Sequence, residues 1–222
     1  MTILALALFG SCARGDAAPG SDVDLMLVTT EPRVRHAAMG NMSLYLYPWE
    51  KLLRDARDGD LFVCHIVYEA RPLHDPKDLV PALRKAFRFK DSYALEIRNA
   101  ADLGWFILRN VDDLPGHLAT KRIAWCVRTI LIAKAAERRT PIFSAAALAR
   151  STGDRHVRRL ITLKANASLT PKDIALFTFF LTEQGLLDPV PDGDTAGYVD
   201  RFKSHHNRVA LQTLISGHIN YL

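Results

Sequence analysis

The chain has 222 residues, of which 49% are apolar and 24% charged, and it contains no low-complexity tract. This composition excludes a disordered or fibrous protein and is typical of a globular protein long enough for one large or two small domains. The formal net charge is +5, and no apolar run reaches the roughly 20 residues that a membrane-spanning helix needs.

The first 29 residues contain two apolar runs separated by a small polar turn. Residues 3–9, ILALALF, end at Gly10-Ser11 and predict a strand, and residues 22–29 predict an adjacent second strand. A signal peptide or a lipid-anchored start at Cys12 explains the same residues less well, because the start has no basic segment and the apolar run is short.

Two aspartates lie two positions apart in the second predicted strand. Side chains at i and i+2 project from one face of a strand, so Asp22 and Asp24 are expected to point the same way. Val23, Leu25 and Leu27 would then point to the other face and enter a core.

Paired carboxylates at a sheet edge suit Mg²⁺, a hard cation that takes oxygen ligands and is usually shared with substrate phosphates. Gly10 allows the backbone to approach a phosphate, and Ser11 adds a hydroxyl and an amide donor. The pattern therefore indicates nucleoside triphosphate chemistry. A plain β-hairpin with two solvated aspartates is the structural alternative.

The spacing Gly10-Ser11-x₂-Arg14-Gly15-x₅-Ser21-Asp22-x-Asp24-Leu25 resembles the signature of the DNA polymerase β-type nucleotidyltransferase superfamily. It is most similar to the minimal nucleotidyltransferase branch, which includes small antitoxins and antibiotic-modifying enzymes. The resemblance implies that the protein transfers a nucleoside monophosphate from a triphosphate to an acceptor hydroxyl and releases pyrophosphate.

The resemblance also implies a role for each residue of the motif. Asp22 and Asp24 would be catalytic and would bind one or two Mg²⁺ ions, while Gly10 and Ser11 would hold the β- and γ-phosphates. Arg14 would brace the turn or contact phosphate. Ser21 would brace the start of the second strand.

The chain up to residue 75 reads as a small mixed α/β domain. Residues 29–40 are polar and predict a connection, and Pro72 suits an edge strand, where proline is tolerated. The predicted elements are a strand over 42–47, helices over 49–57 and 61–70, and a short edge strand over 71–75. This order resembles the catalytic domain of the family.

One position departs from the family pattern. The third strand usually supplies a third carboxylate, but its expected position falls at or near Ser43, and residues 42–47 contain no acid. Deprotonating an acceptor hydroxyl needs a positioned base. In some antibiotic-modifying relatives the base is a glutamate of the helical domain, and Glu96 is our candidate, ahead of Glu69. A surface helix carboxylate is the plain alternative for Glu96.

Residues 76–222 are expected to form an α-helical domain, so the predicted fold class is α+β, a small mixed sheet followed by a helical bundle. Residues 117–139 are apolar on all sides, which predicts a central helix. The predicted helices span 76–89, 91–111, 117–139, 143–150, 154–165, 171–187 and 195–220.

Three cysteines, Cys12, Cys64 and Cys126, are far apart and lie in apolar or helical contexts. They predict buried free thiols rather than a disulfide framework or a metal site. A reducing, cytoplasmic location follows from that prediction.

Arg201 and His206 have the Arg-x₄-His spacing that resembles the active site of HEPN ribonucleases, and minimal nucleotidyltransferases are commonly paired with HEPN proteins. Two residues at this spacing carry little information without structural context. His205-His206 as a metal site lacks an evident third ligand.

The acceptor stays open between a protein, an RNA and a small molecule. Residues 84–164 hold 17 Lys and Arg against 7 Asp and Glu, whereas the rest of the chain holds 12 against 17. This basic segment suits a polyanionic partner, and equally a set of helices with solvated outer faces. The competing function is a non-catalytic, antitoxin-like regulator that keeps the nucleotide pocket and acts by binding a partner. A toxin partner and a homo-oligomer both stay open. No membrane partner is expected.

Overall fold

The computed structural model describes residues 2–17, 20–190 and 195–217. The chain forms two compact units. The first comprises Met1–Asp91 and Ala136–Ser144, and the second comprises Ser92–Ala135 and Ala145–Leu222. No helix in the described ranges has the length and apolar character needed to cross a membrane.

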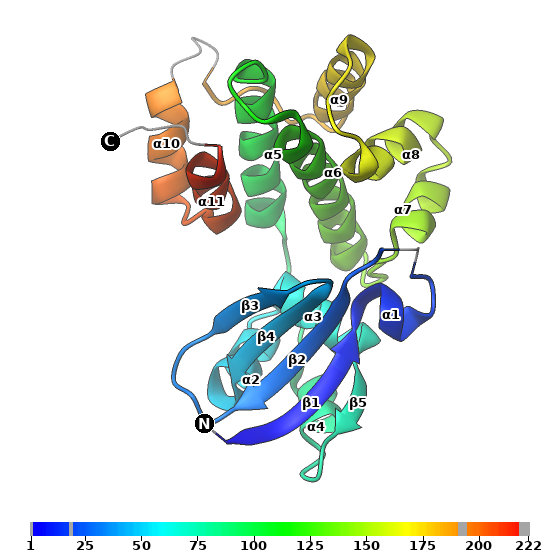
Figure 1. Ribbon diagram of the computed structural model, residues 1–222, viewed down its shortest axis with the longest axis vertical. Helices are drawn as coiled ribbons and strands as arrows, with labels where there is room; N and C mark the ends of the chain where they lie inside the picture. Colours follow the sequence, from blue (N-terminus) through cyan, green and yellow to red (C-terminus); the bar gives the residue numbers. More distant parts are fainter. Residues whose placement is uncertain (1, 18–19, 191–194, 218–222) are drawn as a thin grey trace. The chain divides into compact units, whose positions relative to one another are not determined.

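A mixed five-stranded sheet of order β3-β4-β2-β1-β5 organises the first unit (Figure 1). β2 runs parallel to β4, and the other neighbours are antiparallel. The predicted strands and the helices up to residue 75 are confirmed to within a residue or two, with β5 at an edge as expected. The elements are β1 Ile3–Phe9, α1 Gly10–Arg14, β2 Val23–Thr29, β3 Arg35–Met39, β4 Met42–Pro48, α2 Trp49–Arg57, α3 Leu61–Glu69, β5 Arg71–His74 and α4 Leu79–Ala86.

The first unit extends beyond the predicted division at residue 75. Val80 and Leu83 of α4 are buried, and α4 packs on α2, α3 and β1. The segment 136–144 also joins this unit. Because α4 is buried against α2 and α3, it belongs to the first unit, whose first stretch ends at Asp91.

The prediction of a plain connection over residues 29–40 was wrong, because it contains strand β3. β3 pairs antiparallel with β4, with Ala38 opposite Ser43. All five residues of β3 are exposed, so the strand has no alternation of apolar and polar residues that would reveal it. Backbone pairing alone defines this edge.

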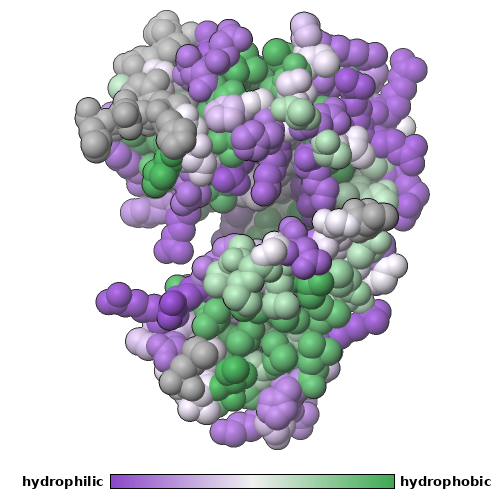
Figure 2. All heavy atoms as spheres, in the orientation of Figure 1, coloured by the Kyte–Doolittle hydropathy of each residue, from purple (hydrophilic) through white to green (hydrophobic). Residues whose placement is uncertain are grey.

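The two faces of the sheet differ. In Figure 1, α2, α3 and α4 lie behind the sheet, and the face toward them carries the buried strand residues Ala5, Ala7, Phe9, Met26 and Val28. The opposite face carries half-exposed residues, and Figure 2 shows apolar side chains gathered over this region. They include Leu4, Leu6, Leu8, Leu25, Leu27, Leu44 and Leu46.

The expectation that Val23, Leu25 and Leu27 enter a core was therefore wrong. These three side chains are only half-buried, whereas the alternate residues Met26 and Val28 are buried. The reason is that the helices cover the face of β2 that carries Asp24, rather than the face opposite to it.

The second unit is helical, as predicted. Its longest helix, α6, buries Ile123, Val127 and Ile130. The start of α9 is fixed by a capping box between Thr170 and Asp173. The helices are α5 Ala94–Arg109, α6 Gly116–Glu137 (whose last residues join the first unit), α7 Ala145–Thr152, α8 Arg155–Thr162, the 3₁₀ turn Leu163–Ala165, α9 Pro171–Glu183, α10 Thr195–Ser204 and α11 Arg208–Ser216.

The prediction of one continuous helix over 195–220 was wrong within the described residues, and 218–220 lie outside them. The chain breaks between α10 and α11 because His206 adopts the left-handed conformation, with φ 51°. Asn207 then caps α11 by accepting a hydrogen bond from the Ala210 amide, and it donates one to the Asn99 carbonyl.

The three cysteines are free thiols. Cys64 and Cys126 are buried as predicted, but Cys12 is only half-buried. Its helix, α1, lies in the turn between β1 and β2, where the Cys12 Sγ reaches the Asp22 carbonyl oxygen at 3.5 Å.

Candidate active site

The paired aspartates lie at the start of β2. Asp24 is the second residue of the strand, Asp22 directly precedes it, and Ser21 comes just before Asp22. Asp24 is opposite Phe9 of β1. The Phe9 ring meets the His65 ring of α3 edge-on, with 5.4 Å between the ring centroids. Asp24 therefore lies on the sheet face that α3 covers.

Gly10 lies close to the Asp24 carboxylate. Gly10 has φ 73°, in the left-handed region that favours glycine. A Cβ at this position would lie 2.6 Å from Oδ2 of Asp24, which is closer than real Cβ atoms come. The glycine of the turn therefore lies beside the Asp24 carboxylate of β2. Ser11 follows Gly10 in the first turn of α1.

The environment of Asp24 disfavours its charged form. Burial raises the pKa of the Asp24 carboxyl, and the neighbouring Asp22 carboxylate raises it further. His65, Arg14 and His36 act in the opposite direction. Repulsion between the Asp22 and Asp24 carboxylates contributes to this raised pKa. A cation bound by both carboxylates would therefore stabilise their charged forms.

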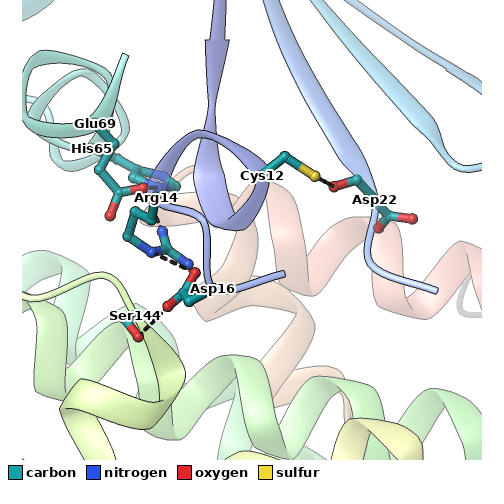
Figure 3. A network of polar contacts seen from close by, with 7 residues as sticks. All are labelled: Cys12, Arg14, Asp16, Asp22, His65, Glu69 and Ser144. Carbon is teal, nitrogen blue, oxygen red and sulfur yellow. Dashed lines mark hydrogen bonds and ion pairs between the residues drawn. The ribbon is translucent and has the colours of Figure 1, made fainter. Parts of the chain in front are cut away.

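Arg14 joins the end of α1 to two carboxylates (Figure 3). Its Nε donates to Asp16 Oδ1 at 3.0 Å and its Nη1 to Glu69 Oε2 at 2.5 Å. The Nε2 atom of His65 lies 2.6 Å from the same Glu69 oxygen. Ser144, in the returning segment 136–144, donates to Asp16 Oδ2 at 2.6 Å. The bond to Glu69 holds the turn against α3, and the bond from Ser144 holds it against the returning segment.

Sequence reasoning missed most of this cluster. Glu69 was only the second candidate for the base, and His65 carried no signal because it lies in an apolar helix. The contact of His65 with Glu69 is an i,i+4 pair, a spacing visible in the sequence, but the approach of Arg14 from 55 positions away is not.

Ser43 of β4 lies beside Asp24 in the sheet. In the parallel pair of β2 and β4, Ser43 is directly in register with Asp24. β4 carries no acidic residue. Among the described residues, no group of three or more His, Cys, Asp or Glu side chains is arranged to hold a metal ion. A metal at this site would therefore depend on Asp22, Asp24 and the substrate.

The other predicted residues lie in the second unit. Glu96 is in the first turn of α5, and its role as a base stays a prediction. Arg201 donates from Nε and Nη2 to the two carboxylate oxygens of Asp102, both at 3.1 Å. His205 Nδ1 lies 3.6 Å from Asp102 Oδ2. Arg201 thus joins α10 to α5, and His206 occupies the break after α10.

Comparisons with known proteins agree with the geometry of the first unit. Residues 2–99 match the model of the nucleotidyltransferase domain family. The match covers less than half of the chain, so it identifies a nucleotidyltransferase domain within the protein. No curated protein is found to be similar.

Among solved structures, a nucleotidyltransferase-like protein from Exiguobacterium sibiricum 255-15 is similar at 15% identity. The similarity covers 82% of this chain and 68% of that one, with a TM-score of 0.37. At these values the similarity carries no information about substrate or mechanism.

Proposed function

We propose that this protein is a Mg²⁺-dependent nucleotidyltransferase that moves a nucleoside monophosphate from a nucleoside triphosphate to an acceptor hydroxyl. The observation that supports this best is the closeness of Gly10 to the Asp24 carboxylate, which leaves no room for a Cβ. It brings a turn suited to phosphates directly beside a carboxylate suited to a metal. The nucleotidyltransferase match over residues 2–99 favours the same chemistry.

The donor set fits a magnesium ion. Asp22 and Asp24 provide hard oxygen ligands, and the raised pKa of Asp24 indicates a carboxyl that a cation would stabilise in its charged form. Asp22 and Asp24 would hold one or two Mg²⁺. The bound ion would supply charge stabilisation for the transferring phosphoryl group.

The residues of the turn would bind the rest of the triphosphate. The backbone at Gly10 and the hydroxyl and amide of Ser11 would hold the β- and γ-phosphates. Arg14, tied to Asp16 and Glu69, would keep α1 in place.

The reaction needs one more group. The acceptor oxygen forms a bond to the α-phosphorus, the bond to the bridging oxygen breaks, and pyrophosphate leaves. A base must take the hydroxyl proton. Because Ser43 stands beside Asp24, this base would not come from β4. We propose Glu96 for this role. A rate of transfer that is unchanged in Glu96→Gln would exclude it.

Labelling measures the activity directly. Purified protein is incubated with Mg²⁺, cell extract and each of the four α-³²P-labelled nucleoside triphosphates. We expect one nucleotide to label an acceptor, and we expect Asp22→Asn and Asp24→Asn to abolish the labelling. Asp58→Asn, at an exposed aspartate after α2, is the matched control. Equal labelling by the Asp24→Asn variant and the control would contradict the proposal.

The register of Ser43 with Asp24 also favours a second candidate function. Without an acid on β4, the site would bind nucleotide without fast transfer and the protein would act as an antitoxin-like regulator through a partner. Binding of a triphosphate with Mg²⁺, together with no labelling by any nucleotide, would support this function over transfer.

A further inference from the structure

A pocket lies in the first unit beside Arg14, Asp16, His65 and Glu69, which we call the Arg14 cluster. Its volume is about 490 Å³, and its lining comes from the ends of α1 and α3, the start of β5, α4 and residues 141–144. Gly10, Ser11, Asp22 and Asp24 do not line it. Figure 3 shows Arg14 and Glu69 to the left of α1 and Asp22 to its right. The pocket is therefore separate from the paired aspartates.

We propose that this pocket binds a nucleotide, a ligand that combines a phosphate with an aromatic ring, and that it does so without a metal ion. The proposal does not rest on the nucleotidyl transfer proposed above, because a nucleotide can be held here without reacting.

Positive charge dominates the lining. The lining contains three arginines, Arg14, Arg71 and Arg84, but only one carboxylate, that of Glu69. The Glu69 side chain is 7% exposed and already bonded to Arg14 and His65. A surplus of positive charge therefore remains, and guanidinium groups are well suited to the oxygens of a phosphate.

Two of these arginines are placed differently. Arg84 is fixed, because its Nε donates to the Val67 carbonyl at 3.0 Å and its Nη2 to the Ala70 carbonyl at 2.5 Å. These bonds use two of the five guanidinium N–H groups. Arg71, the first residue of β5, is exposed, and its side chain makes no hydrogen bond or ion pair within the described part of the chain. It is the group best placed to reach a ligand.

The lining also offers an aromatic surface. Tyr68 is 50% exposed, and its ring centroid is 6.5 Å from that of the buried Phe143. Phe143 in turn stacks on the His65 ring at 4.5 Å. An exposed ring supported in this way can stack on a nucleobase while the arginines hold the phosphate.

Binding of a fluorescent adenosine monophosphate, with a methylanthraniloyl group on the ribose, tests the proposal by anisotropy in excess EDTA. We expect saturable binding to the full-length protein. Arg71→Gln should weaken binding about tenfold, because it removes a charge-assisted hydrogen bond. Arg57→Gln, at an exposed arginine of α2 outside the pocket, should leave the affinity unchanged.

A second variant separates recognition of the ring from recognition of the phosphate. Tyr68→Leu should weaken binding about fivefold or more through lost stacking. Three outcomes overturn the proposal. They are the absence of binding in EDTA, equal affinities of the Arg71→Gln and Arg57→Gln variants, and an unchanged affinity of Tyr68→Leu. Because neither a metal ion nor a transferable phosphoryl group is present, failure of this test leaves the labelling experiment unaffected.

Discussion

Among the residues that the structure describes, an arginine, a carboxylate and a histidine meet twice, once in each unit. In the first unit, the Arg14 guanidinium donates one hydrogen bond to Glu69 and one to Asp16, and Glu69 also contacts His65. In the second unit, Arg201 gives two parallel hydrogen bonds to Asp102 alone, with His205 at 3.6 Å.

The same three residue types therefore have different structural roles in the two units. The Arg201 pair is bidentate, and its Asp102 carboxylate is almost fully buried, which is the geometry of a link between two helices. The Arg14 cluster instead holds α1, the short helix that directly follows β1, and its Arg14 and Glu69 line a pocket. The surroundings of the three side chains, rather than their identities, separate a structural link from a candidate site.

The largest expected effect is on stability, in the second cluster. Arg201→Ala leaves the Asp102 carboxylate buried without its cation and should lower the free energy of unfolding by about 3 kcal/mol. Urea denaturation measures this. Arg208→Ala, at an exposed arginine in the first turn of α11, should change the free energy of unfolding by less than about 0.5 kcal/mol.

The pH dependence sharpens the same prediction. Burial raises the pKa of the Asp102 carboxyl, although Arg201 acts against it. Without Arg201 the charged form is disfavoured further. The difference between the variant and the wild type should therefore shrink as pH falls and the carboxyl becomes protonated. A difference that is constant with pH would show that the loss comes from packing.

The next effect concerns the start of α1. Gly10→Ala places a Cβ against Asp24 and adds backbone strain at positive φ, so it should cost about 2 kcal/mol or more. Gly15→Ala is the matched control, because Gly15 has φ 80° but a Cβ added there would meet no atom within 4 Å. It should cost about 1 kcal/mol from strain alone. Equal losses in thermal denaturation would mean that the Asp24 contact is unimportant.

A smaller effect on stability, but a clear one on activity, is expected for Arg14→Lys. Lysine keeps the charge but cannot bridge Asp16 and Glu69 with a planar group. We expect a loss of about 1 kcal/mol in stability and a fall of roughly tenfold or more in nucleotide transfer, because α1 is less well positioned. Unchanged transfer would assign Arg14 the purely structural role of Arg201.

The smallest effect is a gain. Burial and the Asp22 carboxylate raise the pKa of Asp24 in the folded protein, so the folded state holds that proton more tightly than the unfolded chain. This contribution to stability is lost as pH rises through the raised pKa. Asp24→Asn should therefore stabilise the metal-free protein at neutral pH by up to about 1 kcal/mol.

At a pH below the ordinary carboxyl pKa, the gain from Asp24→Asn should vanish, and melting curves at both pH values test this. Asp58→Asn is again the control. A gain that persists in acid would contradict the electrostatic explanation.

Much of the first unit can be predicted from its sequence because β1, β2 and β4 are mainly apolar runs bounded by clear turns. Ser43 was singled out only through the family resemblance, and its register with Asp24 is seen in the structure. β3 could not, because its five residues are exposed and only backbone pairing defines it. The covered face of β2 also depends on where the helices pack, which alternation within one strand does not reveal.

Long-range contacts account for the rest. The bond between Ser144 and Asp16 spans 128 positions, and no local pattern predicts it. The break between α10 and α11 was missed because His206, rather than a glycine or proline, takes the left-handed conformation there. The paired aspartates, by contrast, are close together in the sequence and needed no tertiary information.

The return of residues 136–144 to the first unit has a practical consequence for anyone who expresses pieces of this protein. A fragment that stops at residue 75 or 91 would lack the serine that bonds Asp16 and the phenylalanine that stacks on His65. Truncation would therefore expose the His65 ring of α3 and loosen the turn that follows β1, even though every motif residue was retained. A fragment that keeps the first unit intact would have to include α6, which leads the chain back to residues 136–144.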